Sequence, residues 1–325
     1  MKKSALIASK IVSVLCLFLF VFALQWDKPV KILMDQYAYS DSKYIDVQGE
    51  TVHYRIQGDP DKEVVVLLHG VSSSLHTWEA WQAELAKKYY VVAIDLPAFG
   101  LTGPFANGDY STEHYMTFLE ALFQKLDLKK MSIIGNSFGG YLAWEYAVFK
   151  PQQVEKLILL APSGLDHAIE GSGKFDIGFW VVKSQVFKYL SWIFTPKVFV
   201  ENSVKNVYLN DEKISADLVD RYFNLLLRQG NRQAFSGVLI AFHSRDKKAL
   251  EEKLSTVKHP VLLQWGEGDN HRNVDVARLF EKKLANATLI VYPSGHVAME
   301  ESPQSTVKDA LVFLDDSKKL SGANE

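Results

Sequence analysis

The chain has 325 residues, of which 48% are hydrophobic and 23% charged, and its net charge is −2. This length accommodates one large domain with an insertion, or two small domains. The nearly neutral charge argues against a nucleic-acid partner, because nucleic-acid-binding proteins usually carry a basic stripe. The single cysteine, Cys16, excludes an intrachain disulfide, and the nine scattered histidines have no metal-ligand spacing, so no metal site is expected.

The first 26 residues differ from the rest of the chain. Lys2 and Lys3 precede an apolar run over residues 11–24 that only Ser13 interrupts. Extended back to residue 5, this stretch has about 20 residues, enough to span a bilayer, although Lys10 lies inside it. We interpret it as an uncleaved membrane anchor, whose lysines favour a cytoplasmic N-terminus with the rest of the chain on the far side. A cleaved signal, giving a secreted or periplasmic protein, and a buried N-terminal helix are the alternatives.

Alternating and apolar runs predict the first elements of the body. Residues 44–56 predict a β-hairpin around Gln48-Gly49. Val64–Leu68 is a continuous apolar run, typical of a strand buried on both faces. A helical stretch near residues 76–87, a strand over Tyr90–Ile94 and an amphipathic helix over Ser111–Leu126 follow.

The same alternation continues with a strand over residues 131–134, a helix over 140–149 and a strand over 157–160. Strands that alternate with helices predict a parallel sheet covered by helices on both faces. From about residue 165 to 254 the pattern changes to aromatic-rich helical segments, such as residues 179–200 and 218–227. Strand patterns return at Val261–Trp265 and Leu289–Tyr292, so the helical part is predicted to be a lid inserted into one sheet.

The segment Gly135–Gly139, with the sequence GNSFG, lies between a predicted strand and a predicted helix. A G-x-S-x-G pentapeptide in that setting predicts a nucleophile elbow, in which the serine occupies a strained turn. Both glycines are expected to be required, because a Cβ at either position would collide with neighbouring backbone. Ser137 is therefore the candidate nucleophile.

A serine hydroxyl becomes a good nucleophile only when a base takes its proton and a carboxylate orients that base. In this topology the acid and then the histidine follow late strands. Asp269 comes soon after the strand ending at Trp265, and His296 soon after the strand ending at Tyr292. Both positions lie where a doubly wound sheet forms its ligand crevice, so we predict a triad of Ser137, His296 and Asp269.

Other assignments stay open at this point. Glu267 or Asp166 could supply the acid instead of Asp269, which would then be a solvated loop carboxylate. His296 could be a surface histidine. The other histidines are expected to be solvated or structural, including His76, His114, His167 and His271.

A tetrahedral intermediate needs backbone N–H donors aimed at its oxyanion. The amide of Phe138, directly after the nucleophile, is one predicted donor. The second is predicted to be Val71, in the loop after the first core strand. His69 in the same loop is expected to shape it through hydrogen bonds.

Together these motifs resemble the α/β-hydrolase fold superfamily over about residues 45–316. The matching segments are His69-Gly70, Asp95–Gly100, Gly135–Gly140, Trp265–Asp269, Gly295-His296 and Glu301–Pro303. The resemblance implies a doubly wound, mostly parallel eight-stranded sheet with a lid between strands six and seven, and no cofactor. It is nearest the branch of single-domain esterases, monoacylglycerol lipases and C–C hydrolases of aromatic ring cleavage. A serine at position 137 excludes the haloalkane dehalogenases and epoxide hydrolases, which use an aspartate there.

The expected domain organisation is an N-terminal segment (1–26), a first part of the core (27–164), a lid (165–255) and a second part of the core (256–325). The predicted activity is that of a serine esterase or lipase acting on a small-molecule or lipid ester through an acyl-enzyme. The membrane segment and an aromatic lid favour an apolar acyl chain, such as that of a monoacylglycerol; the aromatic residues include Phe179, Phe187, Tyr189 and Phe194. The residues expected to contact the substrate are Gly70, Phe99, Trp180 and Trp192.

Two alternatives differ in their chemistry. A C–C bond hydrolase of a meta-cleavage product would suit Asn136 in the elbow and Pro162–Gly164 after the sixth strand, but those pathways run in the cytoplasm. A non-catalytic receptor or scaffold of this fold would be expected to lack a member of the triad, and all three are present in this sequence.

Overall fold

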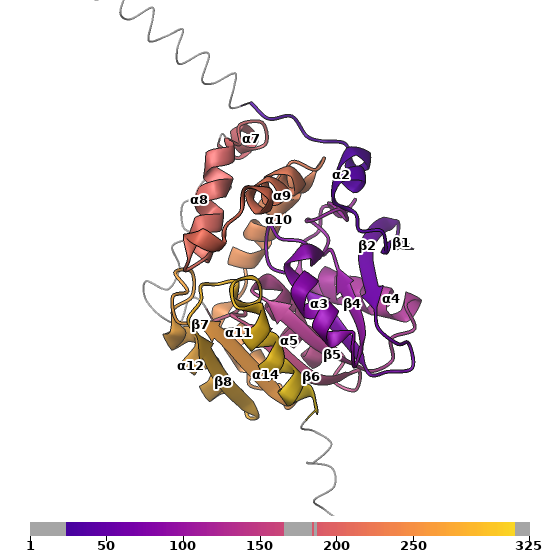
Figure 1. The fold of residues 1–325 in the computed structure, drawn as a ribbon, viewed down its shortest axis with the longest axis vertical. Helices are drawn as coiled ribbons and strands as arrows, with labels where there is room; N and C mark the ends of the chain where they lie inside the picture. The colour runs from indigo at the N-terminus through magenta and orange to yellow at the C-terminus, as the bar shows by residue number, and fades with distance from the viewer. Residues whose placement is uncertain (1–23, 166–183, 185–186, 316–325) are drawn as a thin grey trace, which may run out of the picture.

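One mixed sheet forms the centre of the molecule in the computed structural model, which describes residues 24–165, 184 and 187–315 (Figure 1). Its eight strands run in the order β1-β2-β4-β3-β5-β6-β7-β8. The pairs β1/β2 and β2/β4 are antiparallel, and all other pairs are parallel. The strands are β1 (Ser42–Val47), β2 (Glu50–Gln57), β3 (Val64–Leu68), β4 (Tyr90–Ile94), β5 (Met131–Asn136), β6 (Val154–Leu160), β7 (Val261–Gly266) and β8 (Ala287–Tyr292). The predicted sheet is confirmed.

The two faces of the sheet have separate hydrophobic cores, because successive strand residues point to opposite faces. The helices that cover them are η1 (Leu75–Trp78), α3 (Glu79–Leu85), α4 (Thr112–Lys125), α5 (Phe138–Phe149), α12 (Val274–Lys283), α13 (Ala298–Glu301) and α14 (Pro303–Asp315). Val66 and Leu68 pack into the core that α4, α5 and α12 cover, whereas Val65 and Leu67 pack into the core that α3 and α14 cover. The helix predicted over residues 76–87 thus begins as a 3-10 turn.

A helical insertion between β6 and β7 forms the predicted lid. Its described helices are α7 (Phe187–Ser191), α8 (Lys197–Val207), η3 (Asp211–Lys213), α9 (Ala216–Leu226), α10 (Asn231–His243) and α11 (Lys247–Leu254). The expectation of one helical segment through residue 200 is wrong, since the chain leaves α7 after Ser191 and Pro196 precedes α8. Proline has no N–H for an intrahelical bond, so it separates the two helices.

The first described residues are attached to the lid. The Gln25 N–H donates to the Ile193 carbonyl at 2.8 Å, and the Lys28 N–H donates to the Leu227 carbonyl at 2.6 Å. Helix α2 (Val30–Tyr37), which the sequence analysis did not predict, follows and buries Leu33. Figure 1 shows this start of the described chain beside α7 and α9.

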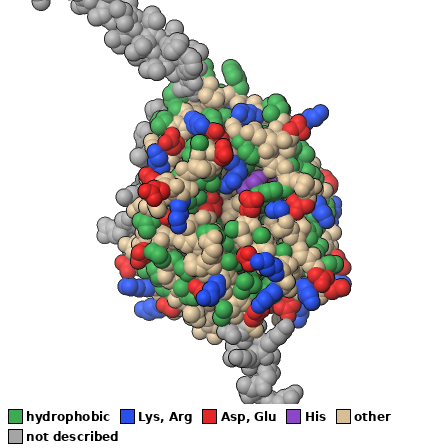
Figure 2. All heavy atoms as spheres, viewed as in Figure 1, with side chains coloured by type: hydrophobic (Ala, Val, Ile, Leu, Met, Phe, Trp, Pro, Cys, Tyr) green, Lys and Arg blue, Asp and Glu red, His purple; other side chains and the backbone are tan. Residues whose placement is uncertain are grey.

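The surface of the described part carries charges of both signs. Figure 2 shows acidic and basic side chains interspersed over one face. Within the described residues, no helix is long and apolar enough to cross a membrane. Residues 1–23, which hold most of the predicted anchor, lie outside the described part.

Candidate active site

Ser137 stands at the junction of β5 and α5, in the predicted strand–serine–helix setting. Its backbone has φ 53° and ψ −113°, which is costly for a residue with a side chain. The two flanking glycines make this turn feasible. A Cβ added to Gly135 would lie 2.4 Å from the Gly139 carbonyl oxygen, and one added to Gly139 would lie 2.2 Å from the Leu68 carbonyl oxygen. The sharp turn therefore places the Ser137 hydroxyl at the start of α5.

His296 and Asp269 form a buried pair beside this turn. His296 Nδ1 lies 2.7 Å from Asp269 Oδ2, while Asp269 Oδ1 accepts the backbone N–H groups of His271 and Arg272, each at 2.8 Å. Burial raises the pKa of Asp269, but attraction to His296 and the hydrogen bonds outweigh burial, so this pKa lies below its ordinary value. An ionised carboxylate only accepts, which assigns the proton to Nδ1 of a neutral His296 and leaves Nε2 with a lone pair.

The guanidinium of Arg272 lies between the serine and the histidine. Its Nη1 donates to Ser137 Oγ at 3.2 Å and to His296 Nε2 at 3.1 Å, and its Nη2 donates to Ser163 Oγ at 2.6 Å. Ser137 and His296 are each 7% exposed and Arg272 is 9% exposed. The structure thus brings the three predicted residues together, with an arginine that the sequence analysis missed. The signal that could have found it is a cation three residues after the candidate acid.

Backbone contacts hold the His296 loop against both the elbow and the lid. The Asn136 side chain donates from Nδ2 to the His296 carbonyl at 3.3 Å, and the His296 N–H donates to the Val207 carbonyl at 2.7 Å. The buried Glu301 carboxylate accepts the N–H groups of Gly295, at 2.6 Å, and of Leu209, at 3.1 Å. The histidine is therefore positioned by the core and the lid together.

The structure describes one of the two alternative acids. Glu267 is exposed, and Asp166 lies outside the described residues. Among the described residues, no group of three or more His, Cys, Asp or Glu side chains could hold a metal ion.

The two predicted oxyanion donors lie on either side of Ser137. Phe138 opens α5, where the first N–H groups have no partner inside the helix. Val71 follows Gly70, and a Cβ added to Gly70 would lie 3.2 Å from the Ser137 Cβ, so this loop lies against the nucleophile. Both positions suit a donor aimed at a carbonyl that Ser137 attacks.

His69 shapes that loop, as predicted. Its Nε2 accepts the Leu96 N–H at 2.9 Å, so its Nδ1 is protonated and donates to the Gly70 carbonyl at 2.7 Å. Burial lowers the pKa of His69, which keeps the ring neutral. The Phe99 ring packs edge-on against His69, with centroids 5.9 Å apart, and against Phe138, with centroids 6.3 Å apart.

The predicted substrate contacts therefore divide into two groups. Gly70 and Phe99 lie beside the elbow. Trp192 makes its contacts within the lid, where Nε1 donates to Ser236 Oγ at 3.3 Å and the ring lies 4.8 Å from that of Tyr189. Trp180 lies outside the described residues.

The other histidines differ in their distance from this site. His76 is structural: it is hydrogen-bonded to Ser74 Oγ at 2.9 Å and to the Tyr37 carbonyl at 2.8 Å. Burial lowers the pKa of His76 to about 4. The His271 ring lies 5.5 Å from the His296 ring and borders the site, while His167 lies outside the described residues.

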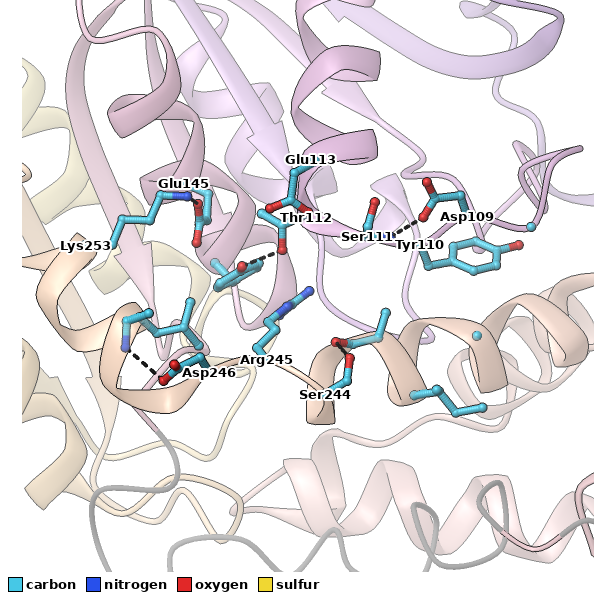
Figure 3. Close-up of a pocket in the computed structure, with 17 residues that line it drawn as sticks. Asp109, Tyr110, Ser111, Thr112, Glu113, Glu145, Ser244, Arg245, Asp246 and Lys253 are labelled. Carbon is cyan, nitrogen blue, oxygen red and sulfur yellow. Dashed lines mark hydrogen bonds and ion pairs between the residues drawn. The ribbon is translucent and has the colours of Figure 1, made fainter.

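A cavity of about 600 Å³ lies elsewhere, between α4 and α5 of the core and α10 and α11 of the lid (Figure 3). Arg245 enters it with its guanidinium 4.0 Å from the centre of the Tyr141 ring. Glu113 and Glu145 also line it, whereas none of the three triad candidates does. This charged cavity is therefore separate from the Ser137, His296 and Asp269 side chains.

The comparison with protein families decides the classification. The family model described as alpha/beta hydrolase fold matches residues 63–303. The chain belongs to the α/β-hydrolase fold family. This α/β hydrolase is 24% identical over 292 residues to the monoacylglycerol lipase ABHD6 of Homo sapiens, an alignment that covers 86% of this chain and 85% of that protein.

This α/β hydrolase is also similar to proteins with other described activities. It is 25% identical over 284 residues to the 2-hydroxy-6-oxononadienedioate/2-hydroxy-6-oxononatrienedioate hydrolase of Cupriavidus pinatubonensis, covering 84% of this chain and 95% of that protein. Among solved structures, a bacterial membrane phospholipase A described as a virulence factor shares the fold, with a TM-score of 0.70 and 21% identity over 97% of this chain and 98% of that one.

Proposed function

We propose that this α/β hydrolase cleaves carboxylic esters through a Ser137–His296–Asp269 triad. The observation that carries the proposal is the strained Ser137 elbow beside a buried His296–Asp269 pair joined at 2.7 Å. A serine in such a turn presents its hydroxyl above the sheet, and a histidine held by a carboxylate is the base that a serine hydroxyl requires.

The reaction begins when Ser137 Oγ attacks the ester carbonyl carbon and His296 Nε2 takes the hydroxyl proton. The carbonyl oxygen becomes an oxyanion, which the Phe138 and Val71 N–H groups stabilise. His296 then gives its proton to the departing alcohol, and Asp269 stabilises the imidazolium in between. Water enters by the same acid–base route, releases the carboxylic acid and restores Ser137.

An apolar acyl chain suits the surroundings of the elbow. The rings of Phe99 and Phe138 lie beside Ser137, and the lid adds Tyr189 and Trp192. The similarity to a monoacylglycerol lipase and to the fold of a membrane phospholipase A supports a lipid ester as the substrate class. The proposed substrate is a monoacylglycerol or a similar lipid ester.

Membrane anchoring through the N-terminal segment is part of the proposal. The apolar run over residues 11–24 leads directly into residues that the lid holds. The Gln25 N–H reaches the Ile193 carbonyl, and Asp27 pairs with the buried Arg232 at 2.5 Å. Trp26 is 78% exposed at this junction, as expected of an aromatic residue at a membrane interface. An anchored chain would therefore hold its lid close to the bilayer.

Fractionation of cells that express the full chain tests the anchor. Recovery of intact chain in the membrane fraction after an alkaline wash supports it. Recovery of a soluble chain whose mass lacks the apolar segment would instead establish the secreted or periplasmic alternative.

A chain-length series of p-nitrophenyl esters, from acetate to palmitate, tests the activity. We expect hydrolysis by the wild type with a maximum at one chain length, and none above background in Ser137→Ala. Labelling of Ser137 by a fluorophosphonate is the companion measurement. Folded protein that neither hydrolyses any of these esters nor takes up the label would overturn the esterase proposal.

A C–C bond hydrolase is the second candidate, favoured by the similarity to the Cupriavidus enzyme and by the Arg272 cation at the nucleophile. Its substrate would carry carboxylates, as the dioate in the name of that relative indicates for its own substrate. Spectrophotometric loss of a ring-fission product, with no activity on the ester series, would select this function.

A further inference from the structure

The cavity between the core and the lid has a buried arginine without a hydrogen-bond acceptor. Arg245, in the turn between α10 and α11, places its guanidinium 4.0 Å from the centre of the Tyr141 ring and 4.6 Å from that of the Phe242 ring. Its Nη1 and Nη2 atoms are buried, and neither has an acceptor among the described residues. Contact with the rings attracts the cation but leaves its in-plane N–H donors unpaired.

Unpaired donors of a buried cation cost free energy, because water no longer solvates them and nothing replaces it. Burial lowers the pKa of Arg245, but a guanidinium stays protonated at neutral pH. Figure 3 shows this side chain projecting from the lid toward Thr112 of α4. The adjoining cavity of about 600 Å³ has the size of a small-ligand site. An acceptor bound there would supply the missing hydrogen bonds.

The other charged groups of the cavity have partners or contact solvent. Glu145 forms an ion pair with Lys253. Asp109 and Asp246 each accept a backbone N–H from two residues further along the chain, at 2.9 Å in both cases. Glu113 is exposed. Of the two cations that line the cavity, only the stacked guanidinium therefore lacks both an ion pair and a hydrogen bond among the described residues.

The lining indicates the class of ligand. A planar guanidinium matches a carboxylate through two parallel hydrogen bonds. The acidic side chains around the cavity repel a dianion about twice as strongly as a monoanion, so they disfavour a phosphate dianion. Ile240, Ala241 and Leu250 supply an apolar wall. These features together suit a monoanion with an apolar body.

We propose that this cavity is a second ligand site, separate from Ser137, in which Arg245 binds the carboxylate of a small organic acid whose apolar body lies against α10 and α11. The inference goes beyond the proposed function and does not rest on it, because it concerns binding and not turnover. A ligand in this position contacts α5 of the core and α10 of the lid. Its binding therefore stabilises the folded protein and the packing of the lid on the core.

Three probes test the class of ligand: hexanoate, its neutral amide hexanamide, and inorganic phosphate at pH 8. Calorimetry and thermal unfolding of the full chain measure their binding. We expect hexanoate to bind at least about tenfold more tightly than hexanamide, because only the carboxylate forms charge-assisted bonds. Phosphate should bind more weakly than hexanoate. Equal binding of hexanoate and hexanamide, or no hexanoate binding at millimolar concentration, would overturn the site.

Variants locate the binding. Arg245→Met should lower the affinity for hexanoate by about tenfold or more, and Arg245→Lys, which keeps the charge but loses the planar fork, should lower it less. Glu113→Gln should raise the affinity, since it removes a charge that repels the ligand. The matched control is Arg278→Met on α12, whose side chain is 71% exposed, and it should leave the affinity unchanged. Hexanoate binding that survives Arg245→Met would belong to another place, such as the surroundings of Ser137, and would reject this site.

Urea unfolding without ligand separates a binding role of Arg245 from a structural one. Arg245→Met should have the same urea midpoint as the wild type or a higher one, because an apolar side chain replaces an unpaired buried charge. A lower midpoint together with unchanged hexanoate binding would make Arg245 a structural link between lid and core. If Arg245→Met does not fold, Ala249→Leu tests the site with the charge retained. It narrows the cavity and should weaken hexanoate binding, and unchanged binding would again reject the site.

Discussion

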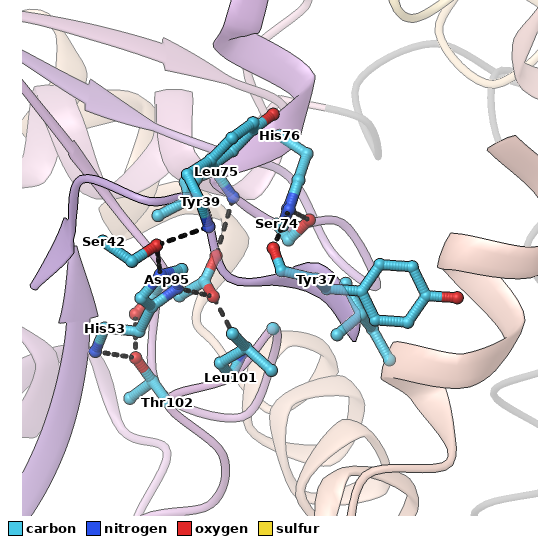
Figure 4. A network of polar contacts seen from close by, with 12 residues as sticks. Tyr37, Tyr39, Ser42, His53, Ser74, Leu75, His76, Asp95, Leu101 and Thr102 are labelled. Carbon is cyan, nitrogen blue, oxygen red and sulfur yellow. Dashed lines mark hydrogen bonds and ion pairs between the residues drawn. The ribbon is translucent and has the colours of Figure 1, made fainter. Parts of the chain in front are cut away.

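The described residues include two Ser–His–Asp arrangements, and we propose that only one of them is a reaction site. At the first, His296 Nδ1 lies 2.7 Å from Asp269 Oδ2. At the second, His53 Nδ1 lies 2.7 Å from Asp95 Oδ2, and His53 Nε2 lies 2.7 Å from Ser42 Oγ (Figure 4). By residue type and distance alone, the second set is the more complete triad.

The surroundings of the two serines separate them. Ser42 lies in the regular strand β1, and its Oγ also accepts the Tyr39 N–H at 2.9 Å. Asp95 accepts the backbone N–H groups of Leu75 and Leu101, each at 2.7 Å, so it joins three segments of chain. Ser137, in contrast, occupies a strained turn that opens a helix. The comparison indicates that a Ser–His–Asp set suits catalysis when the serine lies in a strained turn near N–H donors. The same three residue types in regular structure form a structural junction, a set of buried hydrogen bonds that holds segments of the chain together.

The largest predicted difference is between the two serines. Ser137→Ala should reduce kcat on the best ester about 10⁴-fold or more, as the loss of a nucleophile does in other triads. Ser42→Ala should keep kcat within about twofold and lower the free energy of unfolding by about 1 kcal/mol, the value of one hydrogen bond. Steady-state kinetics and urea unfolding of both variants test this prediction. A large loss of kcat in Ser42→Ala would contradict the different roles of the two serines.

Substitution of Asp269 should mainly affect kcat, whereas substitution of Asp95 should mainly affect stability. Asp269→Asn should lower kcat about 10⁴-fold, because the amide favours the wrong tautomer of His296. Burial raises the pKa of Asp95, but attraction to His53 and their hydrogen bond hold this pKa far below its ordinary value. Asp95→Asn removes a buried charge that three donors face, so it should cost about 3 kcal/mol of stability. An Asp95→Asn protein as stable as the wild type would contradict the structural role of Asp95.

The structural junction around Asp95 should also make the free energy of unfolding sensitive to acid. His76 lies beside it, and burial lowers the pKa of His76 to about 4 from 6.5. Between these values the unfolded chain binds more protons, so the free energy of unfolding falls as the pH falls from 6.5, by on the order of 3 kcal/mol at pH 4. His76→Gln should flatten this slope. Urea unfolding of both proteins at several pH values measures it, and identical slopes would exclude His76 as the cause.

The smallest predicted effects come from one glycine in each region. A Cβ at Gly70 would lie 2.8 Å from Asn136 Oδ1 and 3.2 Å from the Ser137 Cβ, so Gly70→Ala should displace the Val71 donor and lower kcat about tenfold. Gly49 has φ 90° in the hairpin turn, and an added Cβ there meets nothing within 4 Å. Gly49→Ala should cost about 1 kcal/mol of stability and leave kcat unchanged. Equal kinetic effects would show that the Gly70 loop has no special role.

Much of this architecture could be predicted because its signals are local. The hairpin turn at Gln48 and Gly49 has φ of 56° and 90°, the conformation that favours glycine in a tight hairpin. Apolar runs marked β3 to β8, and turn chemistry marked the elbow. The lid was harder, because Pro196 divides what looked like one helical stretch.

The contacts that the sequence analysis missed all join distant parts of the chain. Arg272 reaches Ser163, 109 positions away, and Glu301 reaches Leu209, 92 positions away. His53 meets Asp95 across 42 positions. None of these pairs leaves a periodic or local pattern, because each depends on how separate segments pack.

By itself, the sequence determined the sheet and the serine elbow, since these follow from short-range periodicity and from the few residues that a strained turn tolerates. The order of nucleophile, acid and base stays a prediction. Only the tertiary structure decided which Ser–His–Asp set lies in a strained turn and which is a structural junction. It also placed the buried Arg272 guanidinium against His296 Nε2. The physical reason is that strain, burial and the occupancy of a lone pair are properties of packed neighbours, and packing brings those neighbours from β5, β7 and β8 to one edge of the sheet.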